Sequence, residues 1–281
     1  MSNREMDRQF SLDDVENLDA LFARRSAAAE AALSAFDAEK GIPYEDAPGR
    51  KLNIFPHAGK GHPAPVQIFI HGGFWRSLDA DLFSFLVPGF VPFGAMLVVV
   101  DYPLMPACRM ADVVDACRMA VGWTYRNCAQ FGGDPDRIFI SGNSAGGHLV
   151  AELADRTWLD GYGLPRNVIK GTTAISGIFD LDPVLRSFQN DALLLTDEEI
   201  RAFSPLYRKL DIAGPLIVTV GGEETVEFLK QSAAFAQHAT SCGATVSHMP
   251  VPQTNHITIV LDALAEPGHQ LNRAVRTQMG L

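Results

Sequence analysis

The fold of this chain is decided by the stretch Gly142-Asn143-Ser144-Ala145-Gly146. It follows the apolar run 138–140 and precedes a helix-like segment, 145–153. A serine between two glycines, where a buried strand meets a helix, is typical of a nucleophile elbow. The turn is so sharp that side chains at the two glycine positions would collide with the strand or the helix. The stretch therefore predicts a serine nucleophile at the carboxyl end of a strand.

Apolar runs that alternate with helical segments surround this turn. The expected strands are 52–55, 66–70, 95–100, 137–140, 168–176, 215–220 and 244–249. Near-continuous apolar strands separated by helices indicate a mostly parallel sheet with helices on both faces. Because 281 residues suit one large domain, we expect a single α/β domain over residues 1–281.

Two segments depart from the strand–helix rhythm. Helical spacing of apolar residues predicts a helix from 11 to about 38, within an N-terminal helical segment, 1–45. The charged stretch 182–207 is expected to be a helical insertion above the carboxyl ends of the strands. We hypothesise that both segments form a small cap over the site.

Charge and composition exclude several classes of partner. The formal net charge of −10 argues against nucleic acid and anionic membrane surfaces, which require clustered Lys and Arg. Residues 1–8 lack the apolar core of a signal peptide, and the longest apolar stretch, 90–100, is interrupted by Pro92 and Gly94. The four cysteines show no C-x-x-C pairing. Reduced thiols and a cytoplasmic location are the expectation.

A serine nucleophile needs a base, and the expected base is His256. In this architecture the partners follow in the order serine, acid, histidine. His256 follows the last expected strand, at the start of a helix. His248 lies inside a strand pattern and His238 inside a helix, so both are expected to be structural, while His269 is a less well placed competitor.

The acid is expected directly after the strand 215–220, where the chain reads Gly221-Gly222-Glu223-Glu224. With no aspartate there, a glutamate must orient the imidazole. Glu224 is preferred and Glu223 is the alternative, whereas Glu227 is expected on the following helix. Each carboxylate has a simpler interpretation as a charge that complements the helix dipole.

Oxyanion donors are expected from two places. One is the N–H of Ala145, directly after the nucleophile. The others are Gly72 and Gly73 in the loop His71-Gly72-Gly73-Phe74-Trp75, where glycines let the backbone approach the reacting carbonyl.

Aromatic residues near this loop are candidates for substrate binding. They are Phe74, Trp75 and Tyr102. Core packing is the alternative for Trp75 and Tyr102, and His148 on the elbow helix is expected to be a packing residue. No metal site is expected, because no carboxylate or cysteine accompanies His57 and His62. A dinucleotide site is not expected either, since 142–147 lacks the G-x-G-x-x-G spacing.

Several of these motifs together resemble a known family. They are His71 to Trp75, Asp101-Tyr102-Pro103-Leu104-Met105-Pro106, Gly142 to Leu149, and Asn255-His256. They are similar to the arylformamidase (kynurenine formamidase-like) branch of the hormone-sensitive-lipase-like α/β-hydrolases, over about residues 15 to 265. In that branch the acid lies three residues before a Glu-Phe pair, which favours Glu224. The branch usually carries aspartate there, so this chain departs from it.

The resemblance implies an α/β-hydrolase fold and a hydrolase that needs no cofactor. The expected substrate is a small carboxylic ester or N-acyl amide, often with an aromatic portion, cleaved through an acyl-enzyme on a Ser144–His256–Glu224 triad. The alternative is a non-catalytic small-molecule receptor on the same fold. Homodimers are common in the family, although no interface is recognisable in the sequence.

Overall fold

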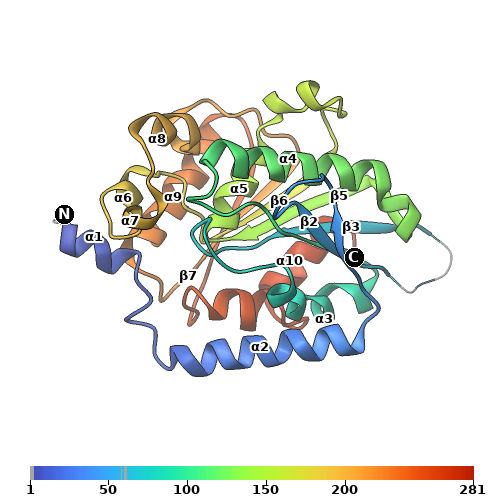
Figure 1. The fold of residues 1–281 in the computed structure, drawn as a ribbon. Coiled ribbons are helices and arrows are strands. Elements are labelled where there is room, and N and C mark those ends of the chain that lie inside the picture. Colours follow the sequence, from blue (N-terminus) through green and yellow to red (C-terminus); the bar gives the residue numbers. More distant parts are fainter. Residues whose placement is uncertain (1–2, 58, 60–61) are drawn as a thin grey trace.

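The computed structural model describes residues 3–57, 59 and 62–281, and an eight-stranded sheet runs through its centre (Figure 1). The strand order is β1-β2-β4-β3-β5-β6-β7-β8. The strands are β1 (Glu39–Pro43), β2 (Lys51–Phe55), β3 (Ala64–Ile70), β4 (Met96–Val100), β5 (Gly133–Asn143), β6 (Ile169–Ile175), β7 (Pro215–Gly221) and β8 (Thr245–Val251). β2 pairs antiparallel with β1 and β4, and every other pair is parallel. This mostly parallel sheet confirms the predicted α/β architecture.

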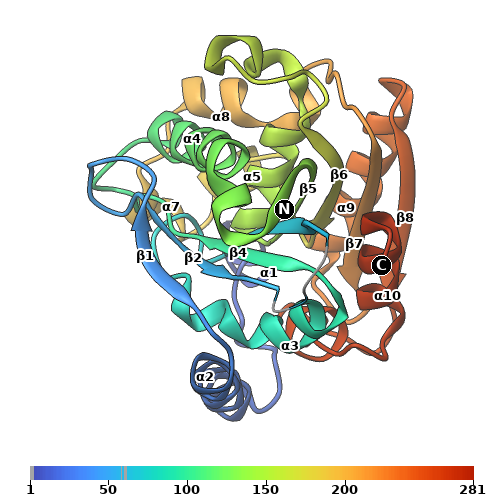
Figure 2. The ribbon, with the colours of Figure 1, turned by 90° about the vertical axis from the view of Figure 1, so that its right-hand side faces the viewer.

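Helices cover both faces of the sheet (Figures 1 and 2). They are α1 (Asn3–Gln9), α2 (Leu18–Ala35), α3 (Val87–Phe90), α4 (Met110–Asn127), α5 (Ala145–Ala154), α6 (Asp182–Leu185), α7 (Asn190–Leu193), α8 (Asp197–Phe203), α9 (Val226–Ser241) and α10 (Gln270–Met279). α4, α5 and α9 pack in one apolar cluster, and α2, α3 and α10 pack in the other.

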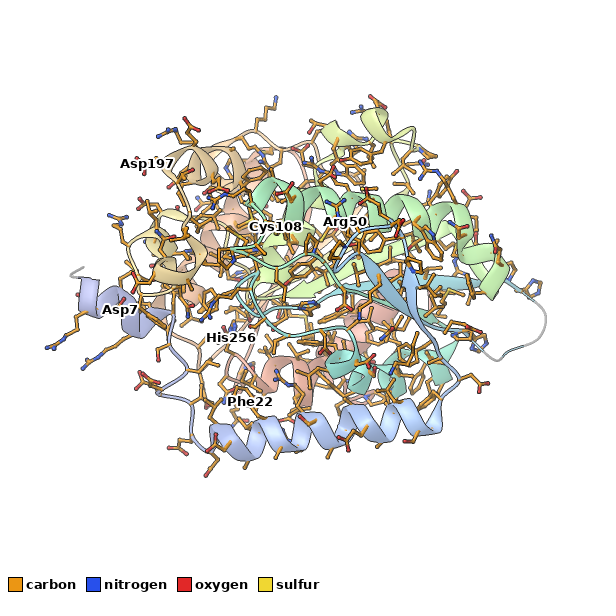
Figure 3. The ribbon with its side chains drawn as sticks, in the orientation of Figure 1. Asp7, Phe22, Arg50, Cys108, Asp197 and His256 are labelled. Atoms are coloured by element: carbon orange, nitrogen blue, oxygen red, sulfur yellow. The ribbon has the colours of Figure 1, made fainter. Side chains whose placement is uncertain are left out.

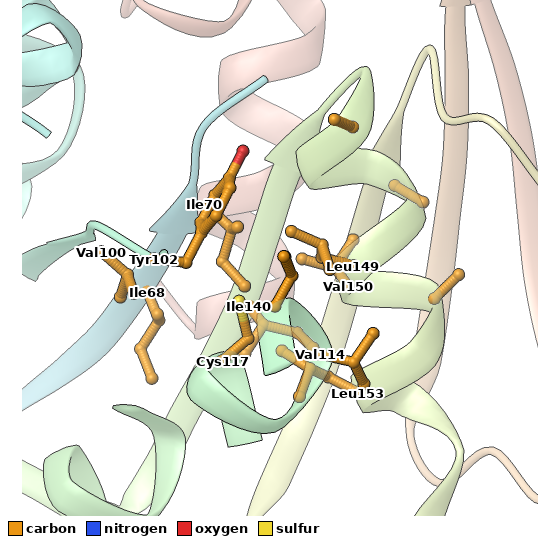
Figure 4. Close-up of a cluster of buried hydrophobic side chains, with 14 of the residues drawn as sticks. Ile68, Ile70, Val100, Tyr102, Val114, Cys117, Ile140, Leu149, Val150 and Leu153 are labelled. Carbon is orange, nitrogen blue, oxygen red and sulfur yellow. The ribbon is translucent and has the colours of Figure 1, made fainter. Parts of the chain in front are cut away.

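The sheet side chains alternate between these two clusters, as strand geometry requires. Ile68, Ile70 and Ile140 face the cluster of α4 and α5, while Phe69 and Phe139 face the other. Figure 4 shows the first cluster, in which Leu149 and Val150 of the elbow helix α5 pack beside Ile140. The helix that carries the nucleophile position is therefore held against the centre of the sheet.

The N-terminal region differs from the sequence expectation at both ends of its helix. Residues 11–17 are turns rather than helix, and α2 begins at Leu18 because Asn17 has a left-handed backbone (φ 55°) that a helix cannot continue through. Residues 39–43, which fall within the expected N-terminal helical segment 1–45, instead form β1, which pairs with β2. This pairing with the next strand in the chain overrides the local signal.

Helices α6, α7 and α8 all lie in the stretch 182–207, between β6 and β7. Among the described residues, no helix is both long and apolar enough to cross a membrane.

Candidate active site

Ser144 occupies a strained turn between β5 and α5. Its backbone angles are φ 60° and ψ −120°, a conformation that costs a non-glycine residue about 1–3 kcal/mol. A Cβ at Gly142 would lie 2.4 Å from the carbonyl oxygen of Gly146, and one at Gly146 would lie 2.0 Å from that of Ile70. The two glycines are therefore required for β5 and α5 to approach β3 this closely.

Glu224 and His256 are in direct contact. His256 Nδ1 lies 2.6 Å from Glu224 Oε2, which makes Glu224 the carboxylate that orients this ring. The side chain of Glu224 is fully buried, whereas Glu223 is exposed and contributes only its backbone N–H, to the Thr254 carbonyl. The structure thus separates the two candidates: Glu224 contacts the histidine and Glu223 does not.

Glu224 is itself held by two donors that leave its second oxygen free for His256. Its Oε1 accepts from the Gly221 N–H at 2.7 Å and from the Ser176 hydroxyl. The sequence reasoning missed Ser176. The signal that would have found it is a polar residue directly after β6, because polar side chains at the carboxyl ends of parallel strands gather at one edge of the sheet.

Ser144 lies at the same edge of the sheet as Glu224 and His256. Ser144 follows β5, Ser176 follows β6, Glu224 follows β7 and His256 follows β8, and these four strands are adjacent. The Ser144 N–H donates to the Ile175 carbonyl at 2.9 Å. Hydrogen bonds therefore connect Ser144 to the pair. Ser144 bonds to Ile175, and the next residue, Ser176, bonds to Glu224, which contacts His256.

The loop 71–75 lies against Ser144. A Cβ at Gly72 would lie 2.9 Å from the Asn143 carbonyl oxygen and 3.1 Å from the Ser144 Cβ, so glycine lets the loop come this close without displacing its neighbours. Within the described part of the chain, the N–H groups of Gly72, Gly73 and Ala145 have no hydrogen-bond acceptor. Since buried backbone N–H groups are nearly always paired, unpaired donors in this loop and directly after Ser144 have the character of an oxyanion-binding site.

Phe74, Trp75 and Tyr102 differ in how far they are buried. Phe74 is half-buried and contacts Phe10 edge-on, with ring centroids 6.2 Å apart. Trp75 and Tyr102 are buried. The Tyr102 hydroxyl donates to the His71 and Gly72 carbonyls at 2.9 and 3.2 Å, so Tyr102 supports the loop from beneath. Substrate contact by these residues stays a prediction.

His71 and Asp101 form a buried pair behind the loop. His71 Nε2 lies 3.7 Å from Asp101 Oδ1, and the ring stacks on Tyr102 at 4.4 Å. Burial lowers the pKa of His71 to about 4 and raises that of Asp101 to about 6. His71 is therefore neutral at pH 7, and its Nδ1 lies 2.7 Å from the Gly72 carbonyl oxygen.

The N-terminal segment lies beside the histidine. Phe10 is buried between Phe74 and Phe228, and the Phe228 ring lies 4.4 Å from that of His256. Figure 3 shows Asp7 of α1, Phe22 of α2 and His256 in the same half of the molecule. A cavity of about 440 Å³ opens between residues 11–21 and His256. Ser144 is 3% exposed and is not part of the cavity lining.

His248 and His238 lie in the strand and the helix in which the sequence places them, and His269, the competitor for the base, lies at the start of α10. His248 is in β8, His238 is in α9, and His269 caps α10 by accepting from the Leu271 N–H. Of the loop that carries His57 and His62, residues 58, 60 and 61 lie outside the described residues. Within the described ones, no group of three or more His, Cys, Asp or Glu is arranged to hold a metal.

Comparisons with known proteins agree on the fold family of this chain. A family model described as the alpha/beta hydrolase fold matches residues 67–260. Kynurenine formamidase of Danio rerio is 29% identical over 277 residues, which cover 97% of this chain and 92% of that protein. Esterase LipQ of Mycobacterium tuberculosis is 30% identical over 238 residues, 76% of this chain and 56% of the esterase.

Solved structures agree with this. The crystal structure of a candidate thioesterase from Silicibacter sp. TM1040 has a TM-score of 0.82 at 26% identity, and covers 97% of this chain and 99% of that chain. Esterase LipW of Mycobacterium marinum has a TM-score of 0.73 at 20% identity, with 93% and 86% covered. The second likeness concerns the fold alone.

Proposed function

This chain belongs to the α/β-hydrolase fold family, and from that premise we propose that it cleaves a small ester or N-acyl amide through an acyl-enzyme on Ser144. That it is a hydrolase of esters or amides, of the serine-hydrolase type and similar to the arylformamidases, rests on its relatives. The catalytic residues and the covalent intermediate are our proposal.

One observation carries the proposal: the 2.6 Å contact between His256 Nδ1 and a buried Glu224, on the strand-end edge that also holds Ser144. With its proton on Nδ1 directed at Glu224, the ring keeps a lone pair on Nε2. That lone pair is what a serine hydroxyl needs as its base.

The reaction then proceeds in two steps, acylation of Ser144 and hydrolysis of the acyl-enzyme. The Ser144 oxygen attacks the substrate carbonyl carbon while its proton passes to His256 Nε2, and the oxyanion binds the N–H groups of Gly72, Gly73 and Ala145. His256 returns the proton to the departing alcohol or amine as the C–O or C–N bond breaks. A water next attacks the acyl-enzyme while its proton passes to His256, and His256 returns that proton to the Ser144 oxygen as the acyl C–O bond breaks, which releases the acid and the free serine.

Among substrates, an N-formyl or other small N-acyl arylamine is our preferred class. The support is the likeness to the Danio rerio kynurenine formamidase, which extends over 97% of this chain. A small ester is the second candidate, supported by the likeness to esterase LipQ.

Paired substrates test both parts of the proposal. An aryl ester, the matching formanilide and the matching acetanilide are assayed with the wild type and with Ser144→Ala. We expect Ser144→Ala to lose about six orders of magnitude in turnover. Formanilide rates comparable with the ester rates support an amidase, and ester turnover alone supports a carboxylesterase. Hydrolysis retained in Ser144→Ala, or none in the wild type, overturns the proposal.

A further inference from the structure

His148 connects three parts of the site that are far apart in the sequence. It lies on α5, four residues after Ser144, and is fully buried. Its Nδ1 lies 3.2 Å from the Trp75 indole Nε1, and its Nε2 lies 2.8 Å from the carbonyl oxygen of Phe203, the last residue of α8. One imidazole thus contacts the loop 71–75, the elbow helix and the insertion between β6 and β7.

These contacts fix the tautomer of the neutral ring. The Phe203 carbonyl only accepts, so Nε2 carries the proton. The Trp75 indole N–H only donates, so Nδ1 offers a lone pair. Burial lowers the pKa of His148 to about 4, in agreement with a neutral ring. Any buried imidazole needs partners for its nitrogens, and what sets His148 apart is that these partners are the loop 71–75 and the insertion between β6 and β7.

The loop that His148 holds is strained. Phe74 and Trp75 both have left-handed backbones, with φ of 49° and 55°, directly after Gly73 at φ 104°. Each such non-glycine residue costs about 1–3 kcal/mol, so it persists only where surrounding contacts hold it. The free N–H groups of Gly72 and Gly73 belong to this loop, and their direction depends on those contacts.

Besides the turn bonds that the Gly73 carbonyl accepts from Arg76 and Ser77, and the contact of His71 with the Gly72 carbonyl, three contacts hold the loop. The Met105 N–H donates to the Trp75 carbonyl at 2.8 Å, and the Tyr102 hydroxyl binds the His71 and Gly72 carbonyls. The third is the indole–imidazole bond, with the two rings edge to face at 5.1 Å. It is the one that connects the loop to the helix of Ser144.

We propose that His148 is a positioning residue. Through Trp75 it fixes the loop 71–75, which carries the proposed oxyanion donors, relative to Ser144, and through Phe203 it links that loop to α8. The inference rests on the proposed function, since it assigns a role in stabilising the oxyanion. It predicts a loss in turnover rather than in substrate affinity, because the loop binds the charge that develops in the transition state.

Three variants separate the two bonds of the ring. His148→Leu removes both. In His148→Asn the amide oxygen takes the position of Nδ1 and accepts from Trp75, whereas in His148→Gln the amide nitrogen takes the position of Nε2 and donates to Phe203. We expect His148→Leu to lower kcat about ten- to a hundredfold with little change in KM. His148→Asn should recover most of the loss, and His148→Gln less of it.

A matched control measures general destabilisation. Asn272 is also fully buried, and its side chain donates to the Gly89 and Leu264 carbonyls away from the site. Asn272→Leu should lower Tm as His148→Leu does, yet leave kcat unchanged. Equal kcat in His148→Leu and the wild type, or equal losses in His148→Asn and His148→Leu, overturns the proposal.

A second readout does not depend on catalysis. The Trp75 indole N–H resonance, assigned with Trp75→Phe, should be protected from exchange in the wild type and in His148→Asn, and should lose that protection in His148→Leu. Unchanged protection in His148→Leu overturns the proposal even if the wild type hydrolyses nothing. Absence of Ser144-dependent hydrolysis, in contrast, counts against the proposed function.

Discussion

At the scale of residues, Glu223 and Glu224 are neighbours with different surroundings. Glu224 is buried and bonded to His256, while Glu223 is exposed. Glu224→Gln keeps the shape but removes the charge that selects the working tautomer and stabilises the imidazolium. We predict a loss in kcat of about four orders of magnitude for Glu224→Gln and little change for Glu223→Gln, measured with an aryl ester. The reverse order would assign the acid to Glu223.

His148 also predicts how stability depends on pH. Burial, with a smaller effect from nearby Arg208, lowers the pKa of His148 to about 4, below its ordinary 6.5. Between these values the unfolded chain binds a proton that the folded protein does not. The stability is therefore complete above pH 6.5 and falls as the pH drops toward 4.

The test compares the free energy of unfolding of the wild type and His148→Gln by urea titration at several pH values between 7.5 and 4.5. Below pH 6.5 the wild type should lose about 1.4 kcal/mol more per pH unit than the variant. His71 and Asp101 are common to both proteins, so their titration cancels in the difference. Parallel curves would contradict a buried, neutral His148.

Residue identities were partly predictable from the sequence. Chain order places Ser144 after β5, the two glutamates 223 and 224 after β7, and His256 after β8, while only the family resemblance favours Glu224 over Glu223. Ser176 was not recognised, since a single serine after a strand has no distinctive spacing. The bonds of Trp75 and His148 were also beyond prediction, because a pair of residues 73 positions apart becomes visible only in three dimensions.

At the scale of elements, the N-terminal segment lies over the site. Gln9 accepts from the Thr225 hydroxyl through its carbonyl and from the Glu227 N–H through its side chain. Phe10 packs between Phe74 and Phe228. We propose that this segment, with the insertion 182–207, is the cap expected from the sequence and that Phe10 limits the size of the substrate.

Phe10→Ala should therefore broaden substrate size. We expect the ratio of kcat/KM for a bulky aryl ester over the matching acetate to rise several-fold, because truncation opens space between the two phenyl rings. Phe93→Ala is the control, since Phe93 is exposed and packs on Arg276 away from the site. An unchanged ratio in Phe10→Ala, or the same rise in Phe93→Ala, would count against this role for Phe10.

The elements themselves were predictable to different degrees. The buried strand β4 is a continuous apolar run and β3 is interrupted only by Gln67, so their positions follow directly from the sequence. β1 was missed because only its pairing with β2 makes Glu39–Pro43 a strand. The start of α2 was predicted too early because the left-handed Asn17 leaves no signal in a pattern of apolar residues.

At the scale of the whole molecule, the net charge is negative, and acidic side chains also line the cavity beside His256. The lining of this cavity includes Asp14, Glu16 and Glu223, within a chain of formal net charge −10. The negative electrostatic potential inside such a cavity repels anions. We predict that a substrate with a carboxylate on its leaving group has a several-fold lower kcat/KM than its neutral amide isostere.

Raising the ionic strength from about 0.05 M to about 0.5 M should narrow this difference, because salt screens exposed charges. Glu16→Gln should narrow it as well. Equal rates for both substrates at low salt would contradict an electrostatic preference of the cavity.

The acyl-enzyme on Ser144 is the central claim, and mass spectrometry after reaction with an aryl fluorophosphonate tests it most directly. We predict one adduct per chain, on the peptide that carries Ser144, with labelling absent in Ser144→Ala, strongly slowed in Glu224→Gln and unchanged in Glu223→Gln. An adduct on another residue, or labelling that persists in Ser144→Ala, would contradict the account.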